Sequence, residues 1–294
     1  MLLRRKILLA LIESCGGELS RTDMQKLLFS YCAERGINYY DFFPHKFGCF
    51  SFLSYQDKRV LTSQGYLKEG DSFKLKRRPS ILKALEPDEQ RHVREFVART
   101  RGLRGKVLVR HVYLNYPYYA HRSEIKERIL SAKERRDVEE AFCPATEPCL
   151  MTLGYEGLTI DAYINKLIER NVALAVDVRR NPISMKYGFS KTRFRNYLKL
   201  VGIEYEHMPA LGIDSSLRKN LETSSDYRKL FHHYAKKSLP TCAGELQRIR
   251  ELLRTHGRIA LTCFEATPTS CHRHKITERL QKSAGWKTPI MHIE

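Results

Sequence analysis

The sequence predicts an α/β protein with a mostly parallel, Rossmann-like sheet in its C-terminal half, preceded by an α-rich winged helix-turn-helix region. Apolar residues recur at helical spacing through the first half. Two prolines mark a linker over 142–148, and beyond it short apolar runs alternate with helical patterns, as in crossover units of parallel sheets. We expect a winged helix over 1–78, a helical connecting region over 79–148 and a Rossmann-like domain over 149–294.

The winged-helix prediction depends on the order of elements in the first region. Helical spacing, capping residues and glycine stops predict three helices, over 4–14, 24–36 and 50–64. Two short strands around a turn, 66–68 and 72–76, then form a basic hairpin. In a winged helix one helix enters the major groove and the hairpin contacts phosphate. A helical protein-interaction domain of the same shape is the alternative.

The remaining elements follow from the same periodicities. In the connecting region we expect helices over 86–99, 106–116 and 123–141. In the Rossmann-like region we expect strands over 149–153, 173–178, 203–208, 258–263 and 288–293. Its helices are expected over 159–170, 191–201, 225–237, 243–256 and 271–282. Strands separated by helices of this length pair in parallel, with helices on both faces.

The composition points to a polyanionic partner. The 294 residues include 52 Lys plus Arg against 33 Asp plus Glu, a formal charge of +19. We therefore expect a nucleic acid, duplex DNA first, and a homodimer is considered because winged helices pair to read two half-sites. Apolar runs stay far below the ~20 residues of a membrane span, so no membrane partner is expected. Eight cysteines without a Cys-x-x-Cys pair predict free thiols in the cytoplasm.

Reactive side chains gather at the predicted strand ends. In an open parallel sheet, ligands bind beyond the carboxyl ends of the strands. These ends and the start of the last long helix carry nine polar candidates: Tyr155, Glu156, Asp177, Arg179, Cys263, Glu265, Cys271, His272 and Arg273. The sequence therefore predicts a functional site at this edge of the sheet.

Four motifs carry a resemblance to a known family. TLGYEG, VDVRRNPISMKYGFSK, EYEHMPALG and ALTCFEATPTSCHRHKI resemble the domain of unknown function 488 family, from Thr152 to about the C-terminus. The resemblance implies the family's fold and places its polar positions at the nine candidates, but the family name gives no reaction. The segment from Gln25 to Leu67 is similar to the N-terminal extension of some members, and loosely to a winged-helix antitoxin-like domain.

The candidates suit chemistry on a nucleotide. A helix N-terminus, with His272 and Arg273, would lower the pKa of Cys271 and make it a thiolate nucleophile, with Cys263 as resolving thiol or as the nucleophile itself. Three carboxylates would supply the acid and the base for cleavage of a glycosidic bond: Glu156, Asp177 and Glu265. Arg179 and Arg273 would hold a phosphate, and Tyr155 would stack on a base.

Zinc would require Cys263, Cys271, His272 and His274 to converge. We expect no metal and no cofactor, since adjacent Cys271 and His272 would point different ways on a helix and a phosphate-binding glycine loop is missing from the sequence. The structural alternative is a buried thiol, an imidazole bonded to a neighbouring strand end, and an Asp177–Arg179 ion pair that orders the following loop.

The leading hypothesis is a nucleic-acid-associated protein of DNA repair, modification or defence. Its winged helix binds DNA, and its α/β domain acts on a base, nucleotide or sugar-phosphate as a Cys- or carboxylate-dependent enzyme. The alternative is a DNA-binding regulator that senses a small anionic ligand without turnover. A third hypothesis is a toxin–antitoxin component whose N-terminal half binds a protein.

Overall fold

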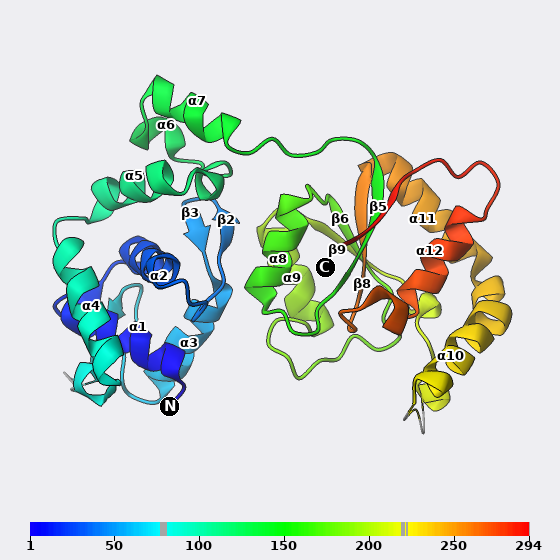
Figure 1. The fold of residues 1–294 in the computed structure, drawn as a ribbon, viewed down its shortest axis with the longest axis horizontal. Coiled ribbons are helices and arrows are strands. Elements are labelled where there is room, and N and C mark those ends of the chain that lie inside the picture. The colour runs from blue at the N-terminus through cyan, green and yellow to red at the C-terminus, as the bar shows by residue number, and fades with distance from the viewer. Residues whose placement is uncertain (77–80, 219–220, 222, 294) are drawn as a thin grey trace. The chain divides into compact units, whose positions relative to one another are not determined.

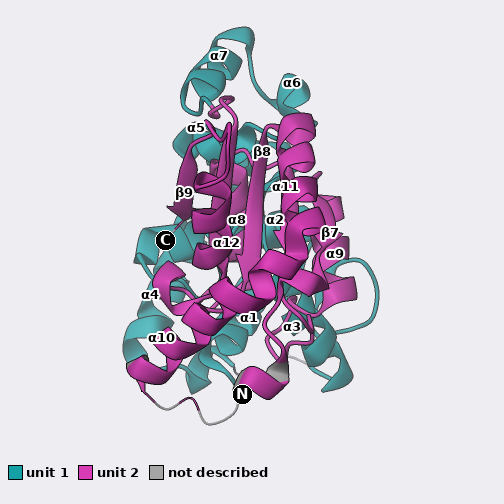
Figure 2. Cartoon of the chain, turned by 90° about the vertical axis from the view of Figure 1, so that its right-hand side faces the viewer, with its two compact units in different colours: residues 1–143 teal, residues 144–294 magenta. Residues whose placement is uncertain are grey.

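The chain divides into two compact units, Met1–Cys143 and Pro144–Glu294, in a computed structural model that describes residues 1–76, 81–218, 221 and 223–293 (Figure 2). The division falls inside the predicted linker over 142–148. Each unit has a hydrophobic core of its own. Among the described residues, no helix is both long enough and apolar enough to cross a membrane.

The first part of unit 1 contains the three predicted helices, α1 (Leu3–Ser14), α2 (Arg21–Arg35) and α3 (Phe52–Ser63). Helix α2 begins where the Ser20 hydroxyl accepts a hydrogen bond from the Asp23 amide at 3.0 Å, and it ends at Gly36, whose φ of 63° is left-handed. These boundaries agree with the predicted ones to within a few residues.

Two small antiparallel sheets accompany these helices. They are formed by the strands β1 (Glu18–Leu19) with β4 (Phe73–Lys74), and β2 (Phe43–His45) with β3 (Gly48–Phe50). A bridge between Leu67 and Leu75 joins the two predicted hairpin segments. Strand β1 and the β2–β3 hairpin were not predicted, because strands of two or three residues are too short to show a period in the sequence.

The connecting region folds onto the same core. Its helices are α4 (Pro87–Arg99), α5 (Gly105–Asn115), α6 (Lys126–Ile129) and α7 (Ala132–Glu140), with 3₁₀ turns η1 (Leu82–Ala84) and η2 (Pro117–Ala120). Phe96 of α4 and Val112 of α5 belong to one cluster with Leu8 and Leu27. The predicted boundary between residues 78 and 79 lies outside the described residues.

The prediction of one helix over 123–141 is wrong. The segment forms two short helices, α6 and α7, with a break at Leu130, whose backbone is extended. Ser131 and Glu134 form a capping box, in which the Ser131 hydroxyl accepts from the Glu134 amide and the Glu134 carboxylate accepts from the Ser131 amide. This box starts a new helix and so interrupts the old one.

Unit 2 is built on a five-stranded parallel sheet, which confirms the predicted fold class. Its strands are β5 (Cys149–Gly154), β6 (Leu174–Asp177), β7 (Glu204–His207), β8 (Arg258–Cys263) and β9 (Ile290–Ile293). They lie in the sheet in the order β7-β6-β8-β5-β9. Gly154 pairs with Cys263, and Asp177 pairs with Thr262. The carboxyl ends of β5, β6 and β8 therefore lie side by side.

Helices cover both faces of this sheet. The helices of unit 2 are α8 (Ile160–Glu169), α9 (Lys191–Leu200), α10 (Ser224–His233), α11 (Ala243–His256) and α12 (Arg273–Gln281). Figure 1 shows α8 and α9 on one face and α11 and α12 on the other. Shorter turns are η3 (Pro209–Leu211), η4 (Ser215–Arg218), the π-helical η5 (Tyr234–Ser238), η6 (Leu239–Cys242) and η7 (Pro268–Ser270).

Candidate functional site

A pocket of about 390 Å³ opens at the carboxyl edge of the sheet in unit 2. Four of the predicted site residues line it: Tyr155, Arg179, Cys263 and His272. The remaining lining residues are Arg180, Asn181, Ile183, Ser184, Met185, Ile213 and Phe264. Arg180 and Asn181 lie three and four residues after Asp177, the last residue of β6, in the segment where the strand-end rule places functional groups. The apolar residues of the loop carry no comparable sequence signal.

Asp177 and Arg179 form a buried ion pair at the end of β6. The Asp177 carboxylate is fully buried and accepts hydrogen bonds from Arg179 Nε at 2.8 Å and Nη2 at 2.6 Å, and from the Tyr205 hydroxyl at 2.8 Å. Burial lowers the pKa of Arg179, but the hydrogen bonds and charge of Asp177 outweigh it and raise that pKa above its ordinary value. The Asp177–Arg179 ion pair that the structural alternative predicted is confirmed. The carboxylate in this pair, that of Asp177, is one of the three that we considered for acid and base catalysis.

Arg179 extends this network to the wall of the pocket. Its Nη1 donates to the Tyr155 hydroxyl at 3.0 Å and to the Phe189 carbonyl oxygen at 2.9 Å. The Tyr155 ring is stacked on Phe189, with centroids 4.2 Å apart and planes at 11°, and only 3% of Tyr155 is exposed. One face of the ring is therefore covered. Phe264, 44% exposed on the same pocket, is the aromatic ring better placed to stack on a ligand.

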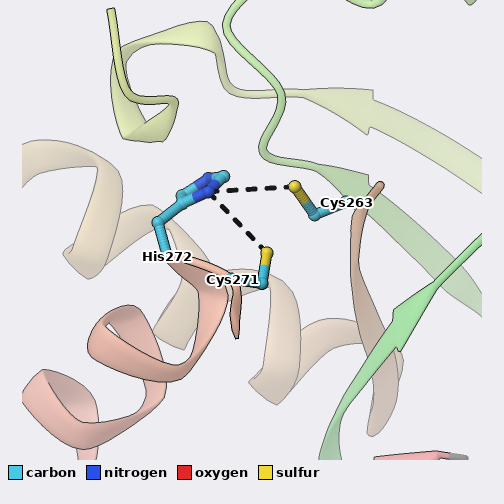
Figure 3. A group of neighbouring side chains, drawn as sticks. All are labelled: Cys263, Cys271 and His272. Carbon is cyan, nitrogen blue, oxygen red and sulfur yellow. Dashed lines mark hydrogen bonds between the residues drawn. The ribbon is translucent and has the colours of Figure 1, made fainter. Parts of the chain in front are cut away.

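Two thiols and one imidazole converge beside the pocket. Figure 3 shows the His272 ring facing Cys263 at the end of β8 and Cys271 ahead of α12. His272 Nδ1 lies 3.8 Å from each of the two sulfurs. The expectation that Cys271 and His272 point apart is wrong, because Cys271 is extended (φ −133°, ψ 143°) and the helix begins only at Arg273. His274, the fourth residue considered for zinc, turns its Nδ1 to the Cys271 carbonyl oxygen.

The hydrogen bonds of His272 define which ring nitrogen holds a proton. Nε2 lies 3.1 Å from the carbonyl oxygen of Val178, just after β6. A carbonyl oxygen only accepts, so Nε2 carries the hydrogen and Nδ1 of the neutral ring turns its lone pair toward the two sulfurs. This bond to a neighbouring strand end is the contact that the structural alternative predicted. A lone pair in this position can take a proton or bind a metal.

The two thiols differ in their surroundings. Cys271 is fully buried, and burial, together with the neighbouring Cys263 thiol, raises its pKa well above the ordinary value. The expected lowering by the helix N-terminus is wrong, because removal from water dominates. Cys263 lines the pocket, and its thiol donates to Glu265 Oε2 at 3.2 Å. Cys263 is thus the thiol within reach of a ligand.

Arg273 and Glu156 fix the loop after β8 and do not line the pocket. The fully buried Arg273 guanidinium donates to Thr152 Oγ1 at 3.3 Å, to the Ala266 carbonyl oxygen at 2.7 Å and to that of Glu265. The exposed Glu156 carboxylate accepts from the Ala266 amide at 2.9 Å. Both side chains therefore hold residues 265–266 in place.

This arrangement, a parallel α/β domain with polar side chains at one sheet edge, defines the class of the C-terminal unit. The family model described as "Domain of unknown function DUF488" matches residues 159–280. The C-terminal half thus carries a domain of this family, which confirms the resemblance. The match spans α8 to α12 and includes Asp177, Arg179, Cys263 and His272, while Tyr155 lies just before it. Neither the curated proteins nor the solved structures contain a match to the chain.

Proposed function

We propose that this protein is a nucleic-acid-associated enzyme. Its C-terminal unit acts on a base, nucleotide or sugar-phosphate in the pocket at the sheet edge, and its N-terminal unit is a winged helix that binds duplex DNA. Eight free cysteines, among them two thiols beside one imidazole, fit a reducing compartment such as the cytoplasm. DNA repair, modification and defence are the roles in which such a pair of units would be used.

The composition of the pocket carries the proposal. The guanidiniums of Arg179 and Arg180 line the same space as the exposed ring of Phe264 and the reactive groups of Cys263 and His272. Guanidiniums recognise phosphate, and an exposed aromatic ring offers a surface on which a base can stack. Because Arg179 is already held by Asp177, Arg180, 47% exposed along its side chain, is the cation freer to turn to a ligand.

The order of elements in unit 1 supports the DNA-binding part. Helices α1, α2 and α3 precede the paired segments around Leu67 and Leu75, and β4 of that hairpin also pairs with β1 from the loop after α1. The hairpin carries exposed lysines at 68 and 76. In a winged helix, lysines of the hairpin contact the DNA backbone, and this is the role that we propose for Lys68 and Lys76.

The pocket is tested by calorimetric titration with nucleoside monophosphates, sugar-phosphates and free bases, followed by product analysis. Arg180→Ala removes a charged hydrogen-bond donor and should weaken binding of a phosphate ligand about tenfold or more. The control is Arg195→Ala, an exposed arginine on α9 outside the pocket. Saturable binding without product would favour the ligand-sensing regulator. If neither variant loses binding, the assignment of the ligand to this pocket is contradicted.

Duplex binding is tested by fluorescence anisotropy of labelled DNA from low to physiological salt. Replacing Lys68 and Lys76 together by Ala should lower the salt slope by about 1–2 counterions, one for each phosphate contact. The matched control replaces Lys133 and Arg136, exposed on α7, and should leave the slope unchanged. Point variants are needed because residues 1–76 share their core with the connecting region, so a deletion would unfold the unit.

A further inference from the structure

We propose that Cys263, Cys271 and His272 form a zinc site whose fourth position opens to the pocket. This inference goes beyond the proposed function, since it concerns the reactive centre of the pocket and holds whatever the ligand of Arg180 is. It rests on three side chains from two segments, the end of β8 and the turn before α12, which converge on one point (Figure 3).

The spacing of the three ligand atoms matches tetrahedral zinc. With Zn–S of ~2.3 Å and Zn–N of ~2.0 Å, tetrahedral geometry separates a sulfur from a nitrogen by about 3.5 Å and two sulfurs by about 3.8 Å. His272 Nδ1 lies 3.8 Å from each sulfur, and the three ligand atoms are all within 4.8 Å of one another. For one ion to bond all three atoms, each nitrogen–sulfur separation has to shorten by about 0.3 Å and the sulfur–sulfur separation by no more than about 1 Å.

The imidazole is already oriented as a metal ligand. Its Nε2 hydrogen is held by the Val178 carbonyl oxygen, which leaves the Nδ1 lone pair facing the thiols. Histidine ligands of metals characteristically donate their other ring N–H to a carbonyl or carboxylate, because this fixes the tautomer and the ring orientation. The ring is further packed against Tyr234, with centroids 5.6 Å apart. The ligand is thus positioned in advance of binding.

The donor set selects a soft divalent ion. Two thiolates and one imidazole favour zinc over magnesium or calcium, which prefer oxygen ligands. Binding converts two thiols to thiolates, so two protons leave to solvent and the ion's two positive charges are balanced by the two sulfurs. The ion with its two thiolates has no net charge, so the free-energy cost of burying an isolated thiolate is avoided.

The fourth coordination position faces the pocket. Cys263 and His272 line the pocket, whereas Cys271 is buried behind them. Three protein ligands with one open position are the arrangement of catalytic zinc, in which a coordinated water becomes a nucleophile near neutral pH. Glu265, whose Oε2 lies 3.2 Å from Cys263 Sγ, stands next to the ion's position and could accept a hydrogen bond from that water.

The test measures metal in the untagged full-length protein, purified under a non-chelating reductant, by plasma mass spectrometry. We expect about one zinc per chain, and less than about a tenth of that in Cys263→Ser, Cys271→Ser and His272→Asn. The control is Cys242→Ser, another buried thiol of unit 2, which donates to the Ala210 carbonyl oxygen and should leave zinc unchanged. Zinc retained by all three variants would overturn the proposal.

A second measurement covers variants that fail to fold. Wild-type protein stripped of metal and titrated with Co²⁺ should develop thiolate charge-transfer and tetrahedral ligand-field bands at one equivalent. Zinc should also protect Cys263 and Cys271, but not the exposed Cys143, from alkylation mapped by mass spectrometry. If the wild-type protein contains no zinc and also develops no cobalt bands, the proposed zinc site is overturned. Both readouts are independent of nucleotide binding, so failure of the proposed function would be seen separately.

Discussion

Buried carboxylates have different roles in the two units. In unit 1, the fully buried Asp57 of α3 accepts hydrogen bonds from Arg4 at 2.7 Å, Arg5 at 2.6 Å and Tyr40 at 3.0 Å, and so ties α1 to α3. In unit 2, Asp177 holds a single guanidinium at the wall of a pocket. The first carboxylate fixes the packing of helices, and the second fixes the position of a side chain that lines the pocket.

The partners of the two carboxylates are exposed to different extents. The side chains of Arg4 and Arg5 are 29% and 18% exposed, whereas Arg179 is only 6% exposed. A guanidinium that loses its carboxylate near the surface regains water, but one inside the protein does not. The same chemical change should therefore cost more in unit 2, and this difference can be measured.

Asp177→Asn should give the largest loss. Removing the charge leaves Arg179 buried without its counter-ion, which costs about 3–5 kcal/mol. The chain's only tryptophan, Trp286, lies in unit 2, so its fluorescence in urea reports the unfolding of that unit. We expect a lower midpoint of the Trp286 transition and loss of ligand binding in the pocket.

Asp57→Asn is the counterpart in unit 1, and we expect about 1–3 kcal/mol because its arginines are partly hydrated. Far-UV circular dichroism should show this loss while the Trp286 transition stays in place. Equal losses for Asp57→Asn and Asp177→Asn would remove the contrast between the units.

Gly154→Ala should have the next largest effect. A Cβ at Gly154 would lie 1.8 Å from the carbonyl oxygen of Glu265, so the loop that Arg273 and Glu156 hold must move. Overpacking of this kind costs about 1–3 kcal/mol, measured by the Trp286 transition in urea. In contrast, Gly244→Ala in helix α11 meets nothing within 4 Å and should stabilise unit 2 by about 0.5–1 kcal/mol. A destabilised Gly244→Ala beside a neutral Gly154→Ala would contradict the close approach.

The sequence predicted the elements of unit 2 better than the roles of its site residues. The central strands β5, β6 and β8 are fully buried, short apolar runs, so they and the edge at Cys263 and Asp177 could be located from the sequence. The outer strands β7 and β9 are partly exposed, and they were located by their place between helical segments. Which of those polar side chains face solvent is decided by tertiary packing. Arg273 follows Cys271 and His272 directly, yet its guanidinium is buried against the loop at 265–266.

The pKa of Cys271 shows why local reasoning failed at the site. Helix position and neighbouring positive residues are readable in the sequence, and both favour a thiolate. Burial is set by what packs over the residue from elsewhere in the chain, and here it dominates. For the same reason the convergence of His272 with the two thiols was missed, since it depends on the extended backbone of Cys271 before α12.

Glu89→Gln should have the smallest effect on the free energy of unfolding, and this effect should depend on pH. Glu89 in unit 1 accepts hydrogen bonds from the hydroxyls of Tyr31 at 2.9 Å and Tyr39, and from Arg35 at 3.2 Å. Burial raises the pKa of Glu89, but these hydrogen bonds outweigh burial and hold that pKa below its ordinary value. Removing the charge should cost about 1 kcal/mol at pH 7, measured by urea unfolding followed by circular dichroism.

The sign of the pH effect follows from this lowered pKa. Near and below pH ~4.5 the unfolded chain takes up the proton first, so the stabilisation by Glu89 is complete above that pH and is lost as pH falls through the folded-state pKa. Glu89→Gln has no such proton to take up, and its stability should fall less steeply than that of wild type between about pH 5 and 3. Glu95→Gln, exposed on the same helix, should keep the wild-type slope. Parallel pH profiles for wild type and Glu89→Gln would show that the charge of this carboxylate does not contribute to the stability of unit 1.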